Sequence, residues 1–183
     1  MTFTYVSGRP CLDFLRTLRF RGGTEAEELL TNPQQLSDWA RQAGLVDAAI
    51  DVTEDDLGSA IALREAAYRI VIARLEQRRP QVADVELLNE RAAQPQLTPR
   101  LLRTGATRRE GTAAQLLATL AADLVDLLAG PGIDNVKRCA HAGCTRLYVD
   151  SSRGQNRHWC GMGTCGNKAK VQAFRARQRA SAG

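Results

Sequence analysis

The stretches Cys139-Ala-His-Ala-Gly-Cys144 and Cys160-Gly-Met-Gly-Thr-Cys165, near the C-terminal end of the chain, each hold two cysteines at the same spacing, and 15 residues separate the pairs. In a closed structural site, zinc takes four thiolates in a tetrahedron at about 2.3 Å, and two short loops that each offer two sulfurs can meet that geometry. The spacing therefore predicts one structural zinc ion bound by Cys139, Cys144, Cys160 and Cys165.

Two disulfides are the alternative, because an even number of cysteines in a small secreted domain allows that pairing. Residues 1–10 lack the basic start and apolar run of a secretory signal, so we expect reduced thiols and a cytoplasmic protein. His141 and His158 could also bind zinc, but four sulfurs already complete a tetrahedron. Cys11 stands alone among apolar neighbours, where a free cysteine is usually a small buried hydrophobic residue.

The two cysteine pairs are expected to be presented differently. Gly143 allows the tight turn of a knuckle at the tip of a hairpin. Residues 167–180 are rich in helix formers, so we expect Cys165 to lie at or in the first turn of a helix, where free amide groups favour a thiolate. A hairpin knuckle followed by a helix is the arrangement of a treble-clef finger, whose small core is expected to contain Tyr148, Trp159, Val171 and Phe174.

The composition is typical of a soluble globular protein, with 183 residues, 44% hydrophobic and 25% charged. No apolar run approaches the roughly 20 residues that cross a bilayer, so we expect no membrane partner. The closed four-sulfur site leaves no open coordination position, and the sequence has no H-E-x-x-H, phosphate-loop or G-x-S-x-G motif. We therefore do not expect an enzyme.

The net charge of +5 is distributed unevenly along the chain. Residues 1–135 hold 15 basic and 19 acidic side chains, whereas the rest holds ten basic residues against Asp150 alone. Lysine and arginine neutralise phosphates, and arginine and glutamine also read base edges in the major groove. The basic residues of the last expected helix, 167–180, therefore indicate binding to duplex DNA. The alternative is a solvated basic tail. The candidate contacts are Arg157, Lys168, Lys170, Arg175, Arg177 and Arg179.

Helical patterns dominate the region before the cysteines. Capping residues and apolar periodicity predict helices over about 33–43, 53–79, 82–93 and 112–129, and the ambiguous segment 10–20 is also expected to be helical. The residues expected to be buried are Trp39, Ile61, Ile70, Leu88, Leu117, Leu120 and Leu124.

Strands are expected over 3–6, over 97–107 around a turn, and over 136–138 and 147–149 beside the first cysteine pair. The Gly/Pro-rich stretch 129–134 predicts a linker. The expected fold is mostly α with small β elements, in which an α-rich N-terminal domain precedes a C-terminal treble-clef-like zinc finger.

The cysteine region resembles a known finger. Residues 139–150, Arg157-His-Trp-Cys160 and Cys165-Gly-Asn-Lys-Ala-Lys170 closely resemble the CGNR zinc finger. The preceding region resembles the ABATE domain, for example in Gly8-Arg-Pro-Cys-Leu-Asp-Phe14. Together they are similar to a family of stress-induced transcription regulators. Two positions depart from the family pattern: Lys168 replaces the last arginine of the finger motif, and Arg16 replaces an asparagine before Thr17.

The resemblance implies an ABATE-like domain over residues 1–130, a CGNR-type finger over 136–183, and duplex DNA as the partner of the finger. The front domain would sense a small-molecule effector or a protein partner. Asp13, Arg16 and Arg64, polar residues close to apolar segments, are the candidates for that site. A protein-interaction module with a purely structural finger is the alternative. RNA binding is a third class, for which the finger lacks a row of exposed aromatic residues.

Overall fold

The computed structural model describes residues 3–180, so residues 1–2 and 181–183, at the outer ends of the two predicted domains, lie outside the described part. Within that part helices dominate, and the strands form two-stranded antiparallel sheets. The predicted fold class, mostly α with small β elements, is confirmed.

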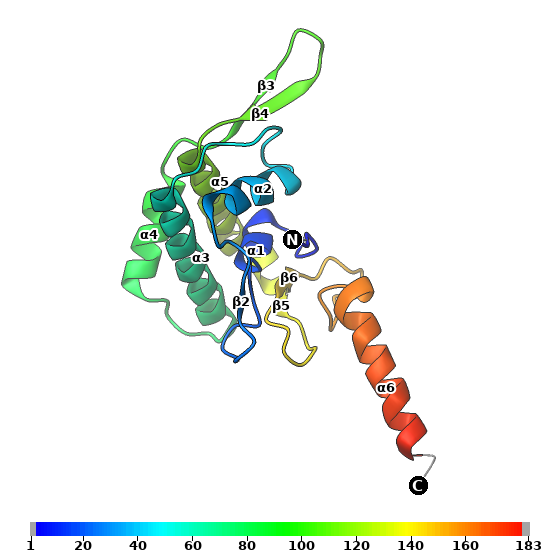
Figure 1. Cartoon of the computed structure of the whole chain (residues 1–183). Coiled ribbons are helices and arrows are strands. Elements are labelled where there is room, and N and C mark those ends of the chain that lie inside the picture. Colours follow the sequence, from blue (N-terminus) through cyan, green and yellow to red (C-terminus); the bar gives the residue numbers. More distant parts are fainter. Residues whose placement is uncertain (1–2, 181–183) are drawn as a thin grey trace.

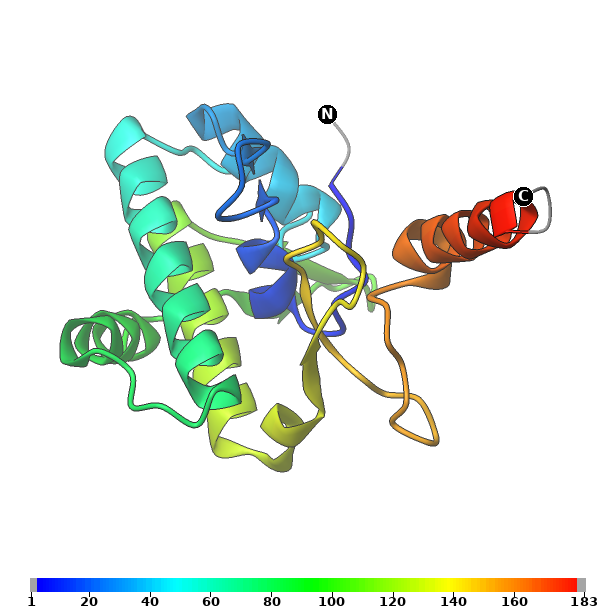
Figure 2. The ribbon, with the colours of Figure 1, turned by 90° about the horizontal axis from the view of Figure 1, so that it is seen from below.

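Three helices, α3 (Glu54–Leu75), α4 (Val82–Ala92) and α5 (Ala113–Ala129), pack against one another in the main body (Figures 1 and 2). Thr53 and Thr112 start α3 and α5 with capping boxes, in which the hydroxyl accepts a hydrogen bond from the backbone amide three residues on. Because such caps satisfy amides that would otherwise be free, both helices begin where the sequence predicts.

Helix α3 ends earlier than the predicted end at Arg79. Gln77 has a φ of +54°, and the Arg78 amide donates to the Ala73 carbonyl at 2.8 Å. This pattern is a Schellman motif, which closes the helix with one residue in the left-handed region. The stop is therefore set by local backbone hydrogen bonds.

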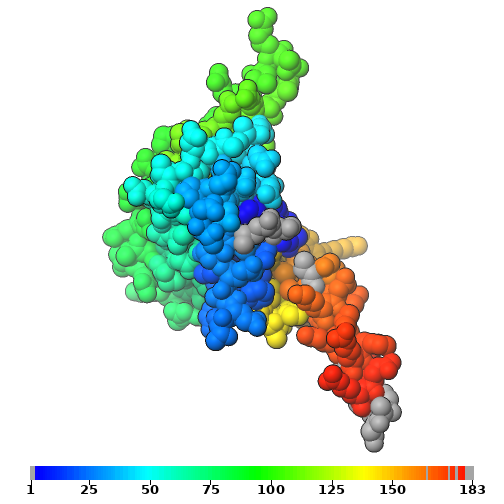
Figure 3. All heavy atoms as spheres, in the orientation of Figure 1, coloured from blue at the N-terminus to red at the C-terminus, as the bar shows by residue number. Residues whose placement is uncertain are grey.

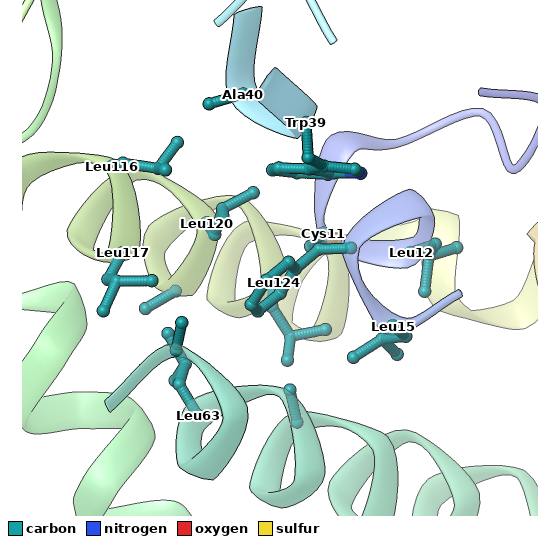
Figure 4. Close-up of a cluster of buried hydrophobic side chains, with 14 of the residues drawn as sticks. Cys11, Leu12, Leu15, Trp39, Ala40, Leu63, Leu116, Leu117, Leu120 and Leu124 are labelled. Atoms are coloured by element: carbon teal, nitrogen blue, oxygen red, sulfur yellow. The ribbon is translucent and has the colours of Figure 1, made fainter. Parts of the chain in front are cut away.

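The core lies between these helices and two shorter ones, α1 (Pro10–Leu15) and α2 (Pro33–Gln42). In Figure 4, Trp39 from α2, Cys11 from α1 and Leu124 from α5 gather in one apolar cluster. Cys11 is buried, as predicted, and the other predicted core residues are buried except Ile61, which is half-buried at the edge of the core.

Short hairpins complete the fold. Strands β1 (Leu18–Arg19) and β2 (Glu27–Glu28), which the sequence did not predict, pair antiparallel. The predicted helix over 10–20 therefore covers only Pro10–Leu15, and its last residues belong to the turn and strand that follow. Strands β3 (Thr98–Leu101) and β4 (Thr107–Glu110) form an exposed hairpin that extends from the body (Figure 1). Strands β5 (Val136–Arg138) and β6 (Leu147–Val149) match their predicted ranges and pair antiparallel.

The predicted strand over residues 3–6 is wrong, because this segment has no strand partner. The amides of Val6 and Ser7 instead donate to the Asp13 carboxylate at 3.1 and 3.0 Å, and Phe3 is buried in the core. A side-chain acceptor takes the bonds that a neighbouring strand would otherwise supply.

The β5–β6 hairpin is tied to the front domain. Val136 and Leu147 belong to the main core, and a 3-10 turn (Pro131–Asn135) joins α5 to β5. The Val149 amide donates to the Ser7 carbonyl at 2.8 Å. Gly8, with a φ of +86°, faces Val149 so closely that an added Cβ would lie 3.3 Å from the valine Cβ. The predicted linker is therefore an ordered turn, and the hairpin shares the core of the front domain.

Helix α6 (Asn167–Ala180) projects away from the rest of the molecule (Figures 1 and 3). It packs mainly against the preceding turn, Met162–Gly166. The expectation that Val171 and Phe174 belong to the finger core is wrong, because their exposed fractions are 47% and 56%. Tyr148 is fully buried beside the cysteines and Trp159 is half-buried there, as predicted.

Candidate metal centre and basic helix

The structure brings the four predicted cysteines together. The sulfurs of Cys139, Cys144, Cys160 and Cys165 all lie within 4.8 Å of one another, and this cluster includes neither histidine. A tetrahedron with bonds of about 2.3 Å places its sulfurs about 3.8 Å apart. The Sγ atoms of Cys160 and Cys165 are 3.7 Å apart, so this pair has the spacing of a zinc tetrahedron.

Each cysteine pair is held by its own local structure. In the knuckle, the Cys144 amide donates to the His141 carbonyl at 2.9 Å, and Gly143 takes a φ of +77°. In the second pair, Cys165 lies in the single turn that leads directly into α6, as the sequence predicts. The Cys160 amide donates to the Cys139 sulfur at 3.4 Å, which joins the two halves.

The thiols need a cation to share this space as thiolates. The hydrogen bond with Cys160, together with burial, raises the pKa of Cys144 far above its usual range. Burial raises the pKa of Cys165 to about 11. The hydrogen bond with Cys144 opposes that rise, whereas Cys160 and Cys139 add to it. A divalent cation reverses this preference, because coordinating thiols lose their protons. The donor set and its spacing both fit zinc.

A second group of side chains supports the cluster. The Tyr148 hydroxyl donates to the Arg157 carbonyl at 2.7 Å, and the Arg157 guanidinium lies over the Tyr148 ring and donates to the Cys160 carbonyl at 2.6 Å. Buried Asp150 accepts bonds from Lys137 Nζ and the Arg157 amide, each at 2.8 Å. Burial alone would raise the pKa of Asp150. Hydrogen bonds from Lys137 and Ser152 outweigh burial and hold this pKa below its usual range. The sequence did not predict this hydrogen-bonded support.

The predicted DNA-binding residues fall into two groups. Arg157 is half-buried and contacts Tyr148 and the Cys160 carbonyl, as described above. The others are exposed along α6: Lys168, Lys170, Arg175, Arg177 and Arg179. The sequence contains no acidic residue after Asp150. The projecting helix therefore carries five basic side chains and no acidic one.

The three residues predicted for an effector site do not form one site. Arg64, 1% exposed, donates to both carboxylate oxygens of Glu28 at 2.7 and 2.6 Å. Asp13 accepts the amides described above and lies 3.4 Å from Arg146. Asp13 and Arg16 line a cavity of about 10 Å³, room for roughly one water, and Arg64 is not among its lining residues. Burial, with help from Arg146, lowers the pKa of Arg16 to about 10.

Comparison with family models agrees with this geometry. A model described as "Putative stress-induced transcription regulator", the ABATE family, matches residues 8–131, more than half of the chain. The chain belongs to the ABATE family. The CGNR zinc finger model matches residues 135–178 of this ABATE protein and includes all four clustered cysteines. Comparison with curated proteins found no match. Within residues 3–180 of the ABATE protein, no helix is long and apolar enough to span a membrane.

Proposed function

We propose that this ABATE protein is a zinc-dependent transcription regulator that binds duplex DNA through α6, acts in the cytoplasm and has no enzymatic activity. One zinc ion bound by the four cysteines would be structural, because four sulfurs fill the tetrahedron and leave no position for a reacting water. Its role is to fix the start of α6. The front domain would carry the regulatory input from an effector or partner.

The observation that carries this proposal is the pattern of exposed side chains on α6. At roughly 3.6 residues per turn, Val171, Phe174 and Gln178 share one strip of the helix. Basic residues flank the strip on both sides: Lys168, Arg175 and Arg179 on one, Lys170 and Arg177 on the other.

Such a pattern suits a helix in the major groove. The central strip of a groove helix faces the base edges, where apolar side chains contact thymine methyl groups and glutamine contacts adenine. The flanking rows face phosphates of the two strands, which position the helix. The row from Lys168 to Arg179 spans about 16 Å at ~1.5 Å per residue, long enough to follow several phosphates.

Arg157 has a different part in this proposal. Because its guanidinium donates to the Trp159 and Cys160 carbonyls, it holds the loop before α6. We expect replacement of Arg157 to weaken DNA binding through loss of helix placement.

The test is the salt dependence of binding to a random duplex, measured with the zinc-loaded full chain. Each neutralised phosphate contributes about −0.9 to the slope of log K against log salt. Replacing Arg175 and Arg179 together by alanine should make the slope less negative by about two. The matched control replaces Arg100 and Arg103, two exposed arginines of the β3–β4 hairpin region, and should leave the slope unchanged. Equal slopes for the wild type and the α6 variant, with zinc retained, would refute α6 as the DNA contact.

The exposure of Val171 and Phe174 also favours a second candidate, a helix that docks into an apolar groove of a protein partner. The two candidates differ in how affinity depends on salt. DNA binding falls steeply as salt rises, whereas apolar docking changes little. Replacement of Phe174 by alanine should abolish docking, but in the DNA case it should cost about 1–3 kcal/mol at one base position.

A further inference from the structure

A cavity of about 210 Å³ lies between the front domain and the cysteine cluster. Arg16, Arg19 and Phe20 line it from the front domain, while His141, Arg146 and Lys168 line it from the finger. No carboxylate is among its lining residues. Cys144, Cys160 and Cys165 also line the cavity, so it reaches the zinc site. Its volume is far larger than a metal ion, so it also extends well beyond that site.

The cavity gathers buried polar atoms that lack partners. Within residues 3–180, four buried side-chain nitrogens have no hydrogen-bond partner, and three of them belong to this cavity: Nε and Nη1 of Arg16 and Nε2 of His141. Leaving a buried donor unpaired costs about 1–3 kcal/mol, and more for a charged group. Most buried polar side-chain atoms in folded proteins have a partner, from the protein, bound water or a ligand. These three nitrogens therefore mark a place where such a partner binds.

The other groups around the cavity do not account for these atoms. Arg146 lies beside Asp13, and Arg19 beside Glu27, so both have carboxylates of their own. A zinc ion with four thiolates carries about two negative charges, which balances part of the basic charge. Even so, the unpaired nitrogens of Arg16 and His141 make no hydrogen bond to a cysteine sulfur.

We propose that this cavity binds a small oxyanionic group, a phosphate or a carboxylate, through the unpaired nitrogens of Arg16 and His141, with Lys168 adding charge at the start of α6. Charge-assisted hydrogen bonds from arginine to such groups are short and strong. The volume is below the roughly 300–1,000 Å³ of ordinary ligand sites, so the group belongs to a compact molecule or to a nucleic-acid backbone.

Occupation of this cavity would link the front domain to the finger. Arg16 directly follows α1, whereas Lys168 lies in the first turn of α6. An anion bound by both would tie the start of the projecting helix to the front domain. The proposal does not depend on DNA binding by α6, because the cavity can be tested without DNA.

The probe is inorganic phosphate, added to the zinc-loaded full chain at constant ionic strength and followed by calorimetry and thermal unfolding. We expect saturable binding and a melting temperature that rises with phosphate. Replacing Arg16 by methionine or His141 by alanine should each weaken binding roughly 10- to 100-fold, the range for a lost hydrogen bond to a charged group. Arg16→Lys should fall between, because lysine keeps the charge but not the guanidinium donors. The control, Arg100→Met, should bind as the wild type does.

A second arm measures duplex DNA affinity in the same variants. If the wild type without DNA binds phosphate and Arg16→Met does not, the cavity takes a free anion. If free phosphate does not bind but Arg16→Met and His141→Ala both lower DNA affinity, the oxyanion is a DNA phosphate. The proposal is overturned if the variants change neither phosphate binding nor DNA affinity. It is also overturned if both variants lose zinc, because the two residues would then belong to the metal centre. Should Arg16→Met fail to fold, His141→Ala decides alone.

Discussion

Arg64 is a charged residue in the middle of α3 whose side chain is almost fully enclosed. It donates to Glu28 through two nitrogens, to Glu65 through Nε at 2.8 Å, and to the Thr17 hydroxyl at 3.0 Å. The β1–β2 region is thereby fastened to the longest helix. Although burial alone would raise it, bonds from Arg21 and Arg64 lower the pKa of Glu65.

At the residue scale we predict that Arg64→Met destabilises the protein by about 2–3 kcal/mol. This is below the 3–5 kcal/mol of a fully buried pair, because the carboxylates of Glu28 and Glu65 are each 31% exposed. Urea unfolding measures the change. The control, Arg41→Met, removes an exposed pair with Asp38 and should cost at most about 0.5 kcal/mol.

The same network gives the change a pH dependence. Because the folded-state pKa of Glu65 lies below its unfolded value, its contribution is present above about pH 4.3 and is lost as the pH falls through the folded pKa. The stability difference between wild type and Arg64→Met should therefore shrink on acidification. A difference that stays constant down to pH 3 would show that the charges of this network do not stabilise the fold.

At the element scale, α6 differs from the helices of the front domain in that its large apolar side chains, Val171 and Phe174, are exposed. Its position depends on the turn Met162–Gly166 and on Cys165, so its own apolar side chains stay available for a partner.

We accordingly predict that replacing two phenylalanines by alanine changes the free energy of unfolding by very different amounts. Phe174→Ala should change the free energy of unfolding by no more than about 0.5 kcal/mol, the usual range for a surface site. Phe14→Ala should cost about 3–5 kcal/mol, because Phe14 is 2% exposed and its ring centroid lies 5.3 Å from that of Trp39. Denaturant titrations of both variants make the comparison. A large cost for Phe174→Ala would mean that α6 folds back onto the finger.

At the scale of the whole molecule, the finger belongs to two packing units. Val136 and Leu147 are part of the main core, whereas Tyr148 and the cysteines form a separate small cluster. The small cluster has too few apolar residues to hold together without the metal.

We therefore predict that metal removal unfolds residues 139–146 and 150–180 and leaves α3, α5 and the β5–β6 pairing folded. Hydrogen exchange of the zinc-loaded protein and of a chelator-treated sample should show protection lost in the finger and retained in those helices. Cys165→Ser should reproduce the loss, and metal analysis should change from about one zinc per chain to none. Cys11→Ala, which alters a cysteine outside the cluster, should keep the zinc. Loss of protection in α3 and α5 as well would show one cooperative unit.

Local signals in the sequence determined much of this protein. The hydroxyls of Thr53 and Thr112 act on amides three residues away, so the starts of α3 and α5 follow from neighbouring residues alone. The equal spacing of the cysteines likewise indicated which residues would form the cluster, because zinc chemistry restricts the donor set. Its exact metal content and the DNA contacts stay predictions.

Only the tertiary structure decided features that depend on residues far apart in the chain. Asp13 takes the amides that a strand at residues 3–6 would have used. Val171 and Phe174 are left exposed because α6 projects away from the body (Figure 1). The cavity beside Arg16 and His141 arises where two segments more than a hundred residues apart meet. Helix caps and metal spacing act through short-range bonds that a sequence records directly, whereas burial and unpaired charge depend on the packing of the whole chain.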